Sequence, residues 1–154
     1  MSCFKAGLSV LGVLEAMCTY YDTFKEVLCF SSAETFTSMF SVSYSEEGSN
    51  NRGVEGLVLS HWNDFLQDVE ENLIELSFSA IIFFVTGCRE VRPCGLALNL
   101  GFLHVAEKNG QRSKFPKANA CSCELHLPVI HATYDAFKED VTFAFLNTKG
   151  FGYA

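Results

Sequence analysis

The stretch that decides the fold is residues 115–128, which read FPKANACSCELHLP. Up to Pro128, cysteine and leucine side chains alternate with polar ones, which is typical of a short strand with one buried face. The sequence therefore predicts a strand that begins at or just after Cys121 and ends at Pro128, because proline cannot donate to a further ladder. Residues 108–117, which precede it, are mostly polar and contain one glycine and one proline. They predict a loop that leads to Cys121.

Downstream of this strand, the spacing of apolar residues predicts a helix from Tyr134 to about Asn147. Its apolar face would be formed by residues three and four positions apart: Tyr134, Phe137, Val141, Ala144 and Phe145. Lys149 and Gly150 follow this helix, as is typical of a helix C-terminus.

Two apolar segments lie upstream of the loop. Residues 96–102 alternate leucine or phenylalanine with small or polar residues and predict a second strand. The run from Phe78 to Val85 is almost wholly apolar and fits either a buried helix or a buried strand. It falls well short of the roughly 18 residues that a membrane span requires, so no transmembrane helix is expected.

The first half of the chain is predicted to be mainly helical. Its clearest amphipathic helix runs from Val54 to Val69. The residues that define its apolar face are Leu57, Val58, Trp62, Phe65, Leu66 and Val69. We interpret Trp62 and Phe65 as core residues and assign no site to them, because large aromatic side chains in such a stripe are usually buried.

Weaker signals precede this helix. Residues 4–17 have helical spacing interrupted by two glycines and predict a first helix. Ser31 followed by Glu34 has the spacing of a capping box and predicts a second, short helix. The apolar face of that helix would consist of Phe36, Met39 and Phe40. Residues 45–53 are rich in turn formers and predict an exposed loop.

Composition separates the chain into two parts. The 154 residues carry a net charge of −7, with 12 acidic and 3 basic side chains in residues 1–75 but 6 acidic and 8 basic ones in residues 76–154. The predicted fold class is α+β, with a mainly helical part over residues 1–72 and a small mixed α/β part over residues 73–154. An acidic chain without clustered Lys and Arg is not expected to bind nucleic acid.

Cysteine usage and the N-terminal residues indicate the compartment. Seven cysteines are an odd number, and no signal peptide or lipidation motif opens the chain. We therefore expect reduced cysteines and a cytoplasmic location, with the nucleus as the alternative. No cofactor is expected.

The last 40 residues resemble the catalytic lobe of HECT-type ubiquitin ligases. In that family a proline-led loop reaches the catalytic cysteine, and a leucine-x-leucine-proline strand follows at a fixed distance. The residues that hold these offsets are Cys121, Leu125, Leu127 and Pro128. Residues 134–145 match the next helix, and residues 150–152 match the family's chain ending. Upstream, residues 84–87 resemble the opening of the same lobe, and residues 62–69 resemble the last helix of the lobe before it.

This resemblance implies that Cys121 is catalytic: it would accept ubiquitin as a thioester from a ubiquitin-conjugating enzyme and pass it to a lysine of a protein substrate. It also implies that Phe151, fourth from the end of the sequence, helps to position the lobe for transfer. The attacking form of a cysteine is the thiolate. Four cations in the preceding loop would favour that form unless they are simply solvated: Lys108, Arg112, Lys114 and Lys117.

The sequence departs from the family pattern in two ways that bear on catalysis by Cys121. Asn119 and Ala120 stand where many members carry histidine and threonine, and losing the threonine hydroxyl would cost roughly 1 to 3 kcal/mol of transition-state stabilisation. Residues 1–72 resemble only the end of a HECT N-lobe, whereas residues 73–154 resemble a complete C-lobe. The docking subdomain for the conjugating enzyme is therefore expected to be missing. Either the chain is a fragment of a longer product or it borrows a partner, and the alternative function is a catalytically degenerate module that binds ubiquitin or another protein.

Two other kinds of chemistry could use the same side chains. A zinc site would use Cys121, Cys123, His126 and His131. The two cysteines are closer in sequence than paired zinc ligands usually are, and strand alternation turns His126 away from both thiols, so no metal is expected. A cysteine protease would need a histidine beside the thiol, and no protease signature surrounds Cys121. Cys123 has the wrong offset for the family, and its predicted place inside the strand makes it a buried packing residue.

Overall fold

In the computed structural model the described residues are 32–88, 97–106 and 110–147, with Gly12, Ala16, Thr19 and Tyr20. The chain divides into two compact units, residues 1–31 and residues 32–154. The predicted helix over residues 4–17 lies almost wholly outside the described residues, and so does Phe151. The elements below belong to the second unit.

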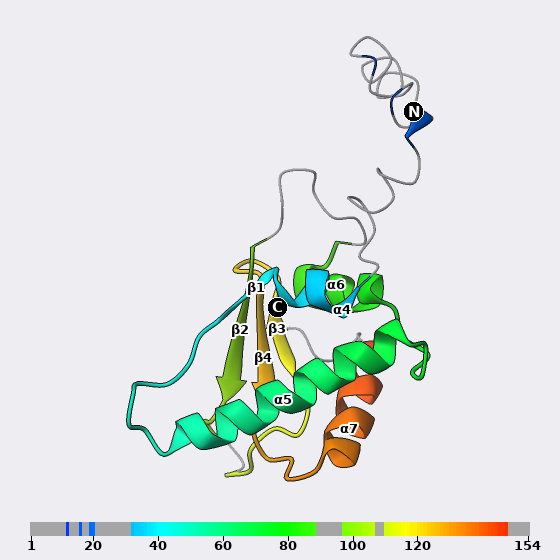
Figure 1. Cartoon of the computed structure of the whole chain (residues 1–154). Coiled ribbons are helices and arrows are strands. Elements are labelled where there is room, and N and C mark those ends of the chain that lie inside the picture. Colours follow the sequence, from blue (N-terminus) through cyan, green and yellow to red (C-terminus); the bar gives the residue numbers. More distant parts are fainter. Residues whose placement is uncertain are drawn as a thin grey trace. The chain divides into compact units, whose positions relative to one another are not determined.

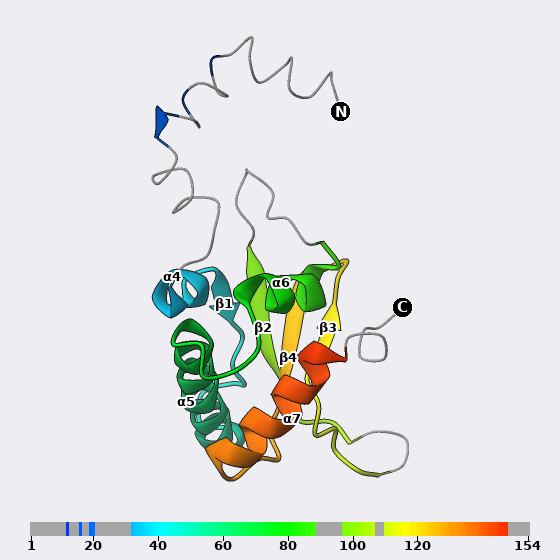
Figure 2. The same ribbon diagram turned by 90° about the vertical axis from the view of Figure 1, so that its right-hand side faces the viewer.

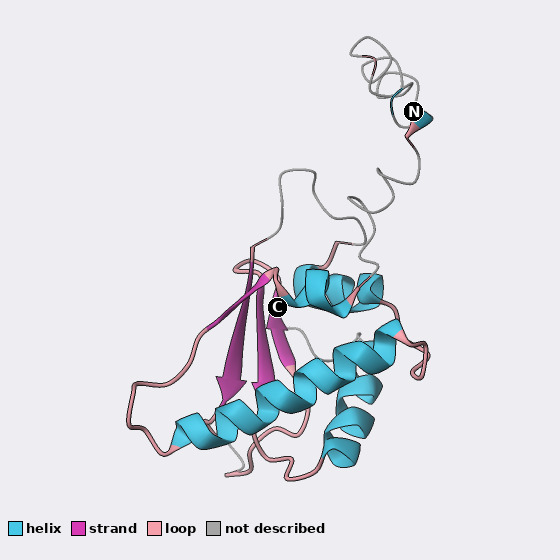
Figure 3. Ribbon diagram, in the orientation of Figure 1, coloured by secondary structure: helices cyan, strands magenta, loops and turns pink. Residues whose placement is uncertain are grey.

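This unit is α+β, as predicted. Its described helices are α4 (Ala33–Thr37), α5 (Asn51–Glu70), α6 (Phe78–Thr86) and α7 (Tyr134–Leu146), and its described strands are β1 (Phe40–Val42), β2 (Leu98–Leu103), β3 (Lys117–Asn119) and β4 (Glu124–Pro128). The strands form one sheet in the order β1-β2-β4-β3 (Figure 1, Figure 3). β1, β2 and β4 run parallel, and β3 is antiparallel to β4. Figure 2 shows α6 and α7 in front of this sheet and α5 on the side of β1.

The apolar run that fitted either a helix or a strand is a helix with a cap at each end. The Ser77 side chain accepts the Ala80 N–H at the start of α6, and Gly87 closes the helix at a φ of 69°, in the left-handed region that favours glycine. Its buried side chains are Phe78, Ile81, Ile82, Phe84 and Val85. In the part of the chain that the structure describes, no helix is both long and apolar enough to cross a membrane.

The first short helix differs from its prediction. α4 is capped by the side chain of Ser32 rather than by Ser31. It ends before Met39 and Phe40, which therefore do not extend its apolar face. Phe40 instead enters β1 and pairs with Leu98 of β2. A partner far along the chain thus overrides the local helical spacing.

Helix α5 supplies the centre of the core, which confirms the interpretation of its aromatic residues. Trp62 and Phe65 have no exposed surface, and their rings stack with centroids 5.8 Å apart. Phe65 also meets Phe137 and Phe145 of α7, at centroid distances of 6.3 and 6.0 Å. The helix begins at Asn51, three residues earlier than predicted, so the exposed loop is shorter than its turn-forming sequence indicated.

A polar clamp also joins α5 to α7. Asp68 Oδ2 accepts a hydrogen bond from Lys138 Nζ at 2.6 Å and another from the Tyr134 hydroxyl. These bonds hold the pKa of the Asp68 carboxyl below its usual value, against the effect of burial. The domain boundary near residue 72 stays a prediction, and the described elements on its two sides share one core.

Candidate functional site at the Cys121 turn

Cys121 is exposed on the turn between β3 and β4. β3 ends at Asn119 and β4 begins at Glu124, and these two residues pair across the antiparallel ladder. The base of the turn is held by the next pair, Ala118 and Leu125, which are 2% and 0% exposed. The thiol of Cys121 is therefore exposed to solvent, and the turn that carries it is held at its base by a buried pair of strand residues.

The side chain of Asn119 shapes this turn. Its Oδ1 accepts the backbone N–H of Cys121 at 3.1 Å, which is the geometry of an Asx turn. Asn119, one of the two positions next to Cys121 that depart from the family pattern and were considered to support it, thus contacts the backbone of Cys121 directly.

Ala120, the second of these positions, lies near the C-terminal end of α6. A Cβ placed on Gly87 would lie 4.0 Å from the Ala120 Cβ. Directly after Gly87, the Cys88 N–H donates to the Thr86 hydroxyl at 3.1 Å. The segment that resembled the opening of the catalytic lobe therefore packs beside the cysteine turn.

Cys123 is not the buried strand residue that its spacing predicted. It is half-buried, it precedes β4, and its φ of 54° lies in the left-handed region, which is uncommon for a residue other than glycine. Its Sγ donates to the carbonyl oxygen of Ala120 at 3.8 Å, across the turn. The strand begins only at Glu124, where pairing with β3 starts, so the apparent alternation at Cys121 and Cys123 belongs to the turn.

The loop ahead of the turn is anchored on α7. Lys114 Nζ donates to Asp140 Oδ1 at 2.7 Å, and His131 Nε2 lies 3.0 Å from Asp140 Oδ2. The Phe115 ring lies 5.6 Å from that of Phe143. Burial acts to raise the pKa of the Asp140 carboxyl, but the bonds from Lys114 and His131 outweigh it and leave the pKa below its usual value.

This anchor corrects one expectation about the loop cations. Lys114 serves as a bridge to Asp140 and does not stand free to favour the Cys121 thiolate. Arg112 is exposed, and Lys108 lies outside the described residues. Lys117 is half-buried on β3, opposite His126.

The histidines considered for the two rival sites have acidic partners in the structure. His131 binds Asp140, and His126 lies 3.5 Å from Glu124. Across residues 32–88, 97–106 and 110–147, no group of three or more His, Cys, Asp or Glu side chains converges as a metal site would require. A cysteine protease could draw its base from His104, His126 or His131, and His104 binds Glu55. His104, His126 and His131 thus each face a carboxylate, and among the described residues no hydrogen bond joins a histidine to the Cys121 thiol.

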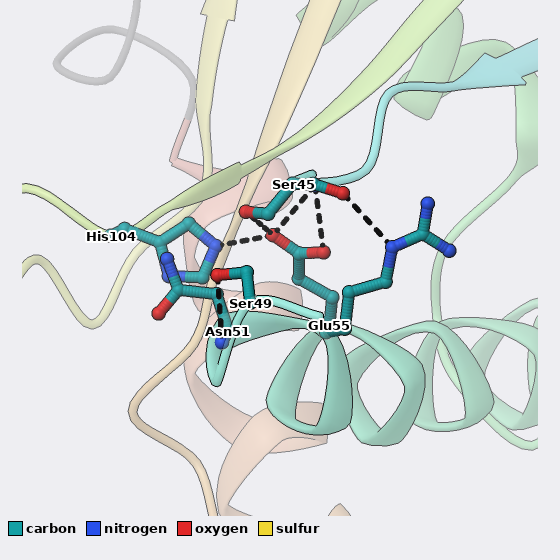
Figure 4. Close-up of polar contacts among 6 residues, drawn as sticks. Ser45, Ser49, Asn51, Glu55 and His104 are labelled. Carbon is teal, nitrogen blue, oxygen red and sulfur yellow. Dashed lines mark hydrogen bonds and ion pairs between the residues drawn. The ribbon is translucent and has the colours of Figure 1, made fainter. Parts of the chain in front are cut away.

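A buried polar cluster at the opposite end of the parallel strands was not predicted. Glu55, in the first turns of α5, is only 1% exposed, and its Oε1 lies 2.6 Å from His104 Nε2, just after β2. Ser45 donates to the same carboxylate through its hydroxyl and, at 3.0 Å, through its backbone N–H (Figure 4). Arg52 Nε in turn donates to the Ser45 carbonyl at 2.9 Å. The cluster therefore ties the loop before α5 and the end of β2 to one helix.

One signal in the sequence pointed to this cluster. Glu55 falls in register with Val58 and Trp62 on the apolar stripe of α5, where an acidic residue is out of place unless it is paired. Burial acts to raise the pKa of the Glu55 carboxyl, but the hydrogen bonds from Ser45 and His104 outweigh it and leave the pKa below its usual value.

The structure thus defines a small α+β domain that presents an exposed thiol on a supported turn. Comparison with known proteins names the class: the family model described as HECT-domain (ubiquitin-transferase) matches residues 59–154. This chain belongs to the HECT-domain family.

Individual relatives agree with this assignment. The chain is 31% identical to proteins named G2/M phase-specific E3 ubiquitin-protein ligase from Homo sapiens and from Gallus gallus, over 94% of its own length. It spans only 19% and 18% of the length of these two relatives.

Proposed function

We propose that this chain carries ubiquitin on Cys121 as a thioester and passes it to a lysine of a protein substrate. The observation that carries the proposal is the exposed Cys121 at the apex of the β3–β4 turn, in the segment that holds the family's signature offsets. Membership of a ubiquitin-transferase family supports the same reaction.

The chemistry needs only the thiol and its two partners. The Cys121 thiolate attacks the thioester carbonyl of a ubiquitin-loaded conjugating enzyme, a new S–C bond forms, and the thiol of that enzyme leaves. A substrate lysine amine then attacks the same carbonyl and gives up a proton, an amide forms, and the Cys121 thiol is released. The first exchange replaces one thioester by another at little net cost, whereas amide formation is effectively irreversible.

Binding of the conjugating enzyme is a separate requirement. The chain covers about a fifth of the length of its relatives. The docking surface expected of the family was also missing from the sequence pattern of residues 1–72. We propose that the conjugating enzyme is held by protein outside these 154 residues.

A nonreducing gel tests this function. The folded chain is incubated with ubiquitin, ATP, the activating enzyme and several conjugating enzymes, and the products are separated with and without a thiol reductant. We expect a ubiquitin adduct that disappears on reduction. Each charged conjugating enzyme is supplied in large excess, because its docking surface is proposed to lie outside these residues. If even this excess yields no reducible adduct with the folded chain, the catalytically degenerate interaction module is the better description.

The Asx turn leads to a prediction about the rate of this step. Asn119→Ala removes the acceptor for the Cys121 N–H, worth about 1 kcal/mol, and should slow adduct formation by roughly fivefold through loss of turn geometry. Asn119→Ser keeps a shorter side-chain acceptor and should recover part of the rate. Single-turnover transfer from a charged conjugating enzyme measures both variants. Equal rates for the alanine variant and the wild type would show that Asn119 does not position the thiol.

A further inference from the structure

The sheet has one apolar and one polar face. Four leucines of β2 and β4 have 1% of their surface exposed or less: Leu98, Leu100, Leu125 and Leu127. Side chains alternate along a strand, so the residues between these leucines lie on the opposite face. Those residues are all at least partly exposed: Asn99, Gly101, Glu124 and His126. The domain therefore keeps a polar sheet face open to solvent on the other side from its core.

One row of this polar face lies next to the Cys121 turn. The strand register joins four polar residues across it: Ser41, Asn99, Glu124 and Asn119. Glu124 and Asn119 are directly opposite each other in the antiparallel ladder, where Cβ atoms are about 5 Å apart. The Asn119 side chain in turn accepts the N–H of Cys121. Glu124 is thus separated from the Cys121 amide by a single side chain.

The Glu124 carboxylate is accessible and has a fixed neighbour. Its side chain is 39% exposed, and its Oε2 lies 3.5 Å from Nε2 of His126. The His126 ring rests on Gly101 of β2: a Cβ at that position would lie 2.8 Å from Nδ1 of the ring, closer than real contacts allow. Glycine therefore makes room for the imidazole, and the imidazole limits where the carboxylate can lie.

The attack of a lysine on the thioester is accelerated by a proton acceptor. A lysine side chain has an ordinary pKa of about 10.4, so at neutral pH it arrives as an ammonium, which has no lone pair for the attack. An acceptor within hydrogen-bond reach of the nitrogen can remove this proton. Among the residues of the four described strands, Glu124 is the only acidic one. It is therefore the acceptor that the sheet brings to the Cys121 turn.

We propose that Glu124 is a catalytic residue that binds the ammonium of the attacking lysine and accepts its proton. The inference rests on the function proposed for Cys121 and extends it to the second step. Asn99, beside Glu124 on β2, offers an amide oxygen to a second N–H of the ammonium. The row therefore favours a lysine over a serine or threonine hydroxyl as the group that receives ubiquitin.

Each proton in this step has a destination. Glu124 takes one proton from the ammonium and leaves a neutral amine, whose lone pair attacks the thioester carbonyl carbon. The N–C bond forms, the C–S bond breaks, and the bonding electron pair leaves with the sulfur of Cys121. A second proton passes from the nitrogen to that sulfur, so the products are an amide, a thiol and a protonated carboxyl. The carboxyl then returns its proton to water.

A two-step assay with the 154-residue chain tests the role of Glu124. The chain is first loaded from a large excess of charged conjugating enzyme, recharging is stopped by removing ATP, and free lysine is then added. Glu124→Gln should load like the wild type, because Cys121 is unchanged. It should discharge to lysine about a hundredfold more slowly, at the low end of the range for general base catalysis. Glu124→Asp keeps the carboxylate and should recover part of the rate, and nonreducing gels measure both steps.

Hydroxylamine separates proton transfer from the shape of the turn. This nucleophile is uncharged at neutral pH and has no ammonium proton to lose, so it should discharge the wild type and Glu124→Gln at similar rates. Glu139→Gln changes an exposed carboxylate of α7 and is the matched control, which should leave both steps unchanged.

Discharge to lysine at the wild-type rate in Glu124→Gln would overturn the inference. Equal slowing with lysine and with hydroxylamine would overturn it too, because it would show that Glu124 supports the shape of the turn instead of taking a proton. A wild-type chain that never loads would contradict the function proposed for Cys121, on which this inference rests, so the two failures are distinguishable.

Discussion

Replacement of Cys121 by serine is expected to change the chemical nature of the ubiquitin adduct. The serine hydroxyl would take ubiquitin as an oxygen ester, which does not exchange with thiol reductants, so a band that survives reduction should replace the reducible wild-type band. Cys121→Ala offers no nucleophile and should lower adduct formation by at least about a thousandfold. Gels run with and without reductant after incubation with a charged conjugating enzyme measure both effects.

The control substitution is at Cys123, two residues after Cys121 in the same turn. Cys123 is half-buried and its thiol is directed to the Ala120 carbonyl, whereas Cys121 is exposed. Cys123→Ser should therefore still form a reducible adduct. A reductant-resistant band in Cys123→Ser together with a reducible band in Cys121→Ser would assign the acceptor to Cys123 instead.

Glu55→Ala should give the largest loss of stability among the polar substitutions, about 3 kcal/mol in the free energy of unfolding at neutral pH. The carboxylate accepts bonds from two groups of Ser45 and from His104, and its removal leaves the Ser45 amide and the imidazole without this acceptor. Glu55→Gln keeps the size of the side chain but loses the charge, and should cost roughly 2 kcal/mol. Urea unfolding of each variant measures the difference.

The Glu55 contribution should also depend on pH. Because the pKa of Glu55 is lowered in the folded state, its stabilisation is present above the unfolded pKa of about 4.3 and is lost as the pH falls through the folded value below it. The stability gap between wild type and Glu55→Gln should therefore be constant near neutrality and narrow below about pH 4. Glu47→Gln, at an exposed position in the preceding loop, is the matched control and should change little. A gap that stays constant down to pH 3 would mean that the carboxylate charge does not carry the effect.

The candidate site was predictable in part. The exposed turn that carries Cys121 could be predicted because its signature is local: the loop, the turn and the leucines of β4 lie within 14 consecutive residues, while the catalytic role of Cys121 stays a prediction. The role of Cys123 could not be predicted, because alternation in a sequence does not show where the ladder with β3 begins. The sequence also did not predict the ion pair by which Lys114 anchors the loop, because its partner Asp140 lies 26 residues further along the chain.

The sequence by itself determined the HECT resemblance, the α+β class and the elements with strong periodicity, which are α5, α7, β2 and β4. Each of those elements has one apolar face that must be buried, and the spacing of the apolar residues along the sequence identifies that face. Only the tertiary structure decided the other features. Phe40 joins a strand because Leu98 is available to pair with it, and Glu55 is tolerated in the core because His104, 49 residues away, and Ser45 satisfy its charge. These outcomes depend on partners that come together only in the folded chain, where desolvation makes pairing obligatory.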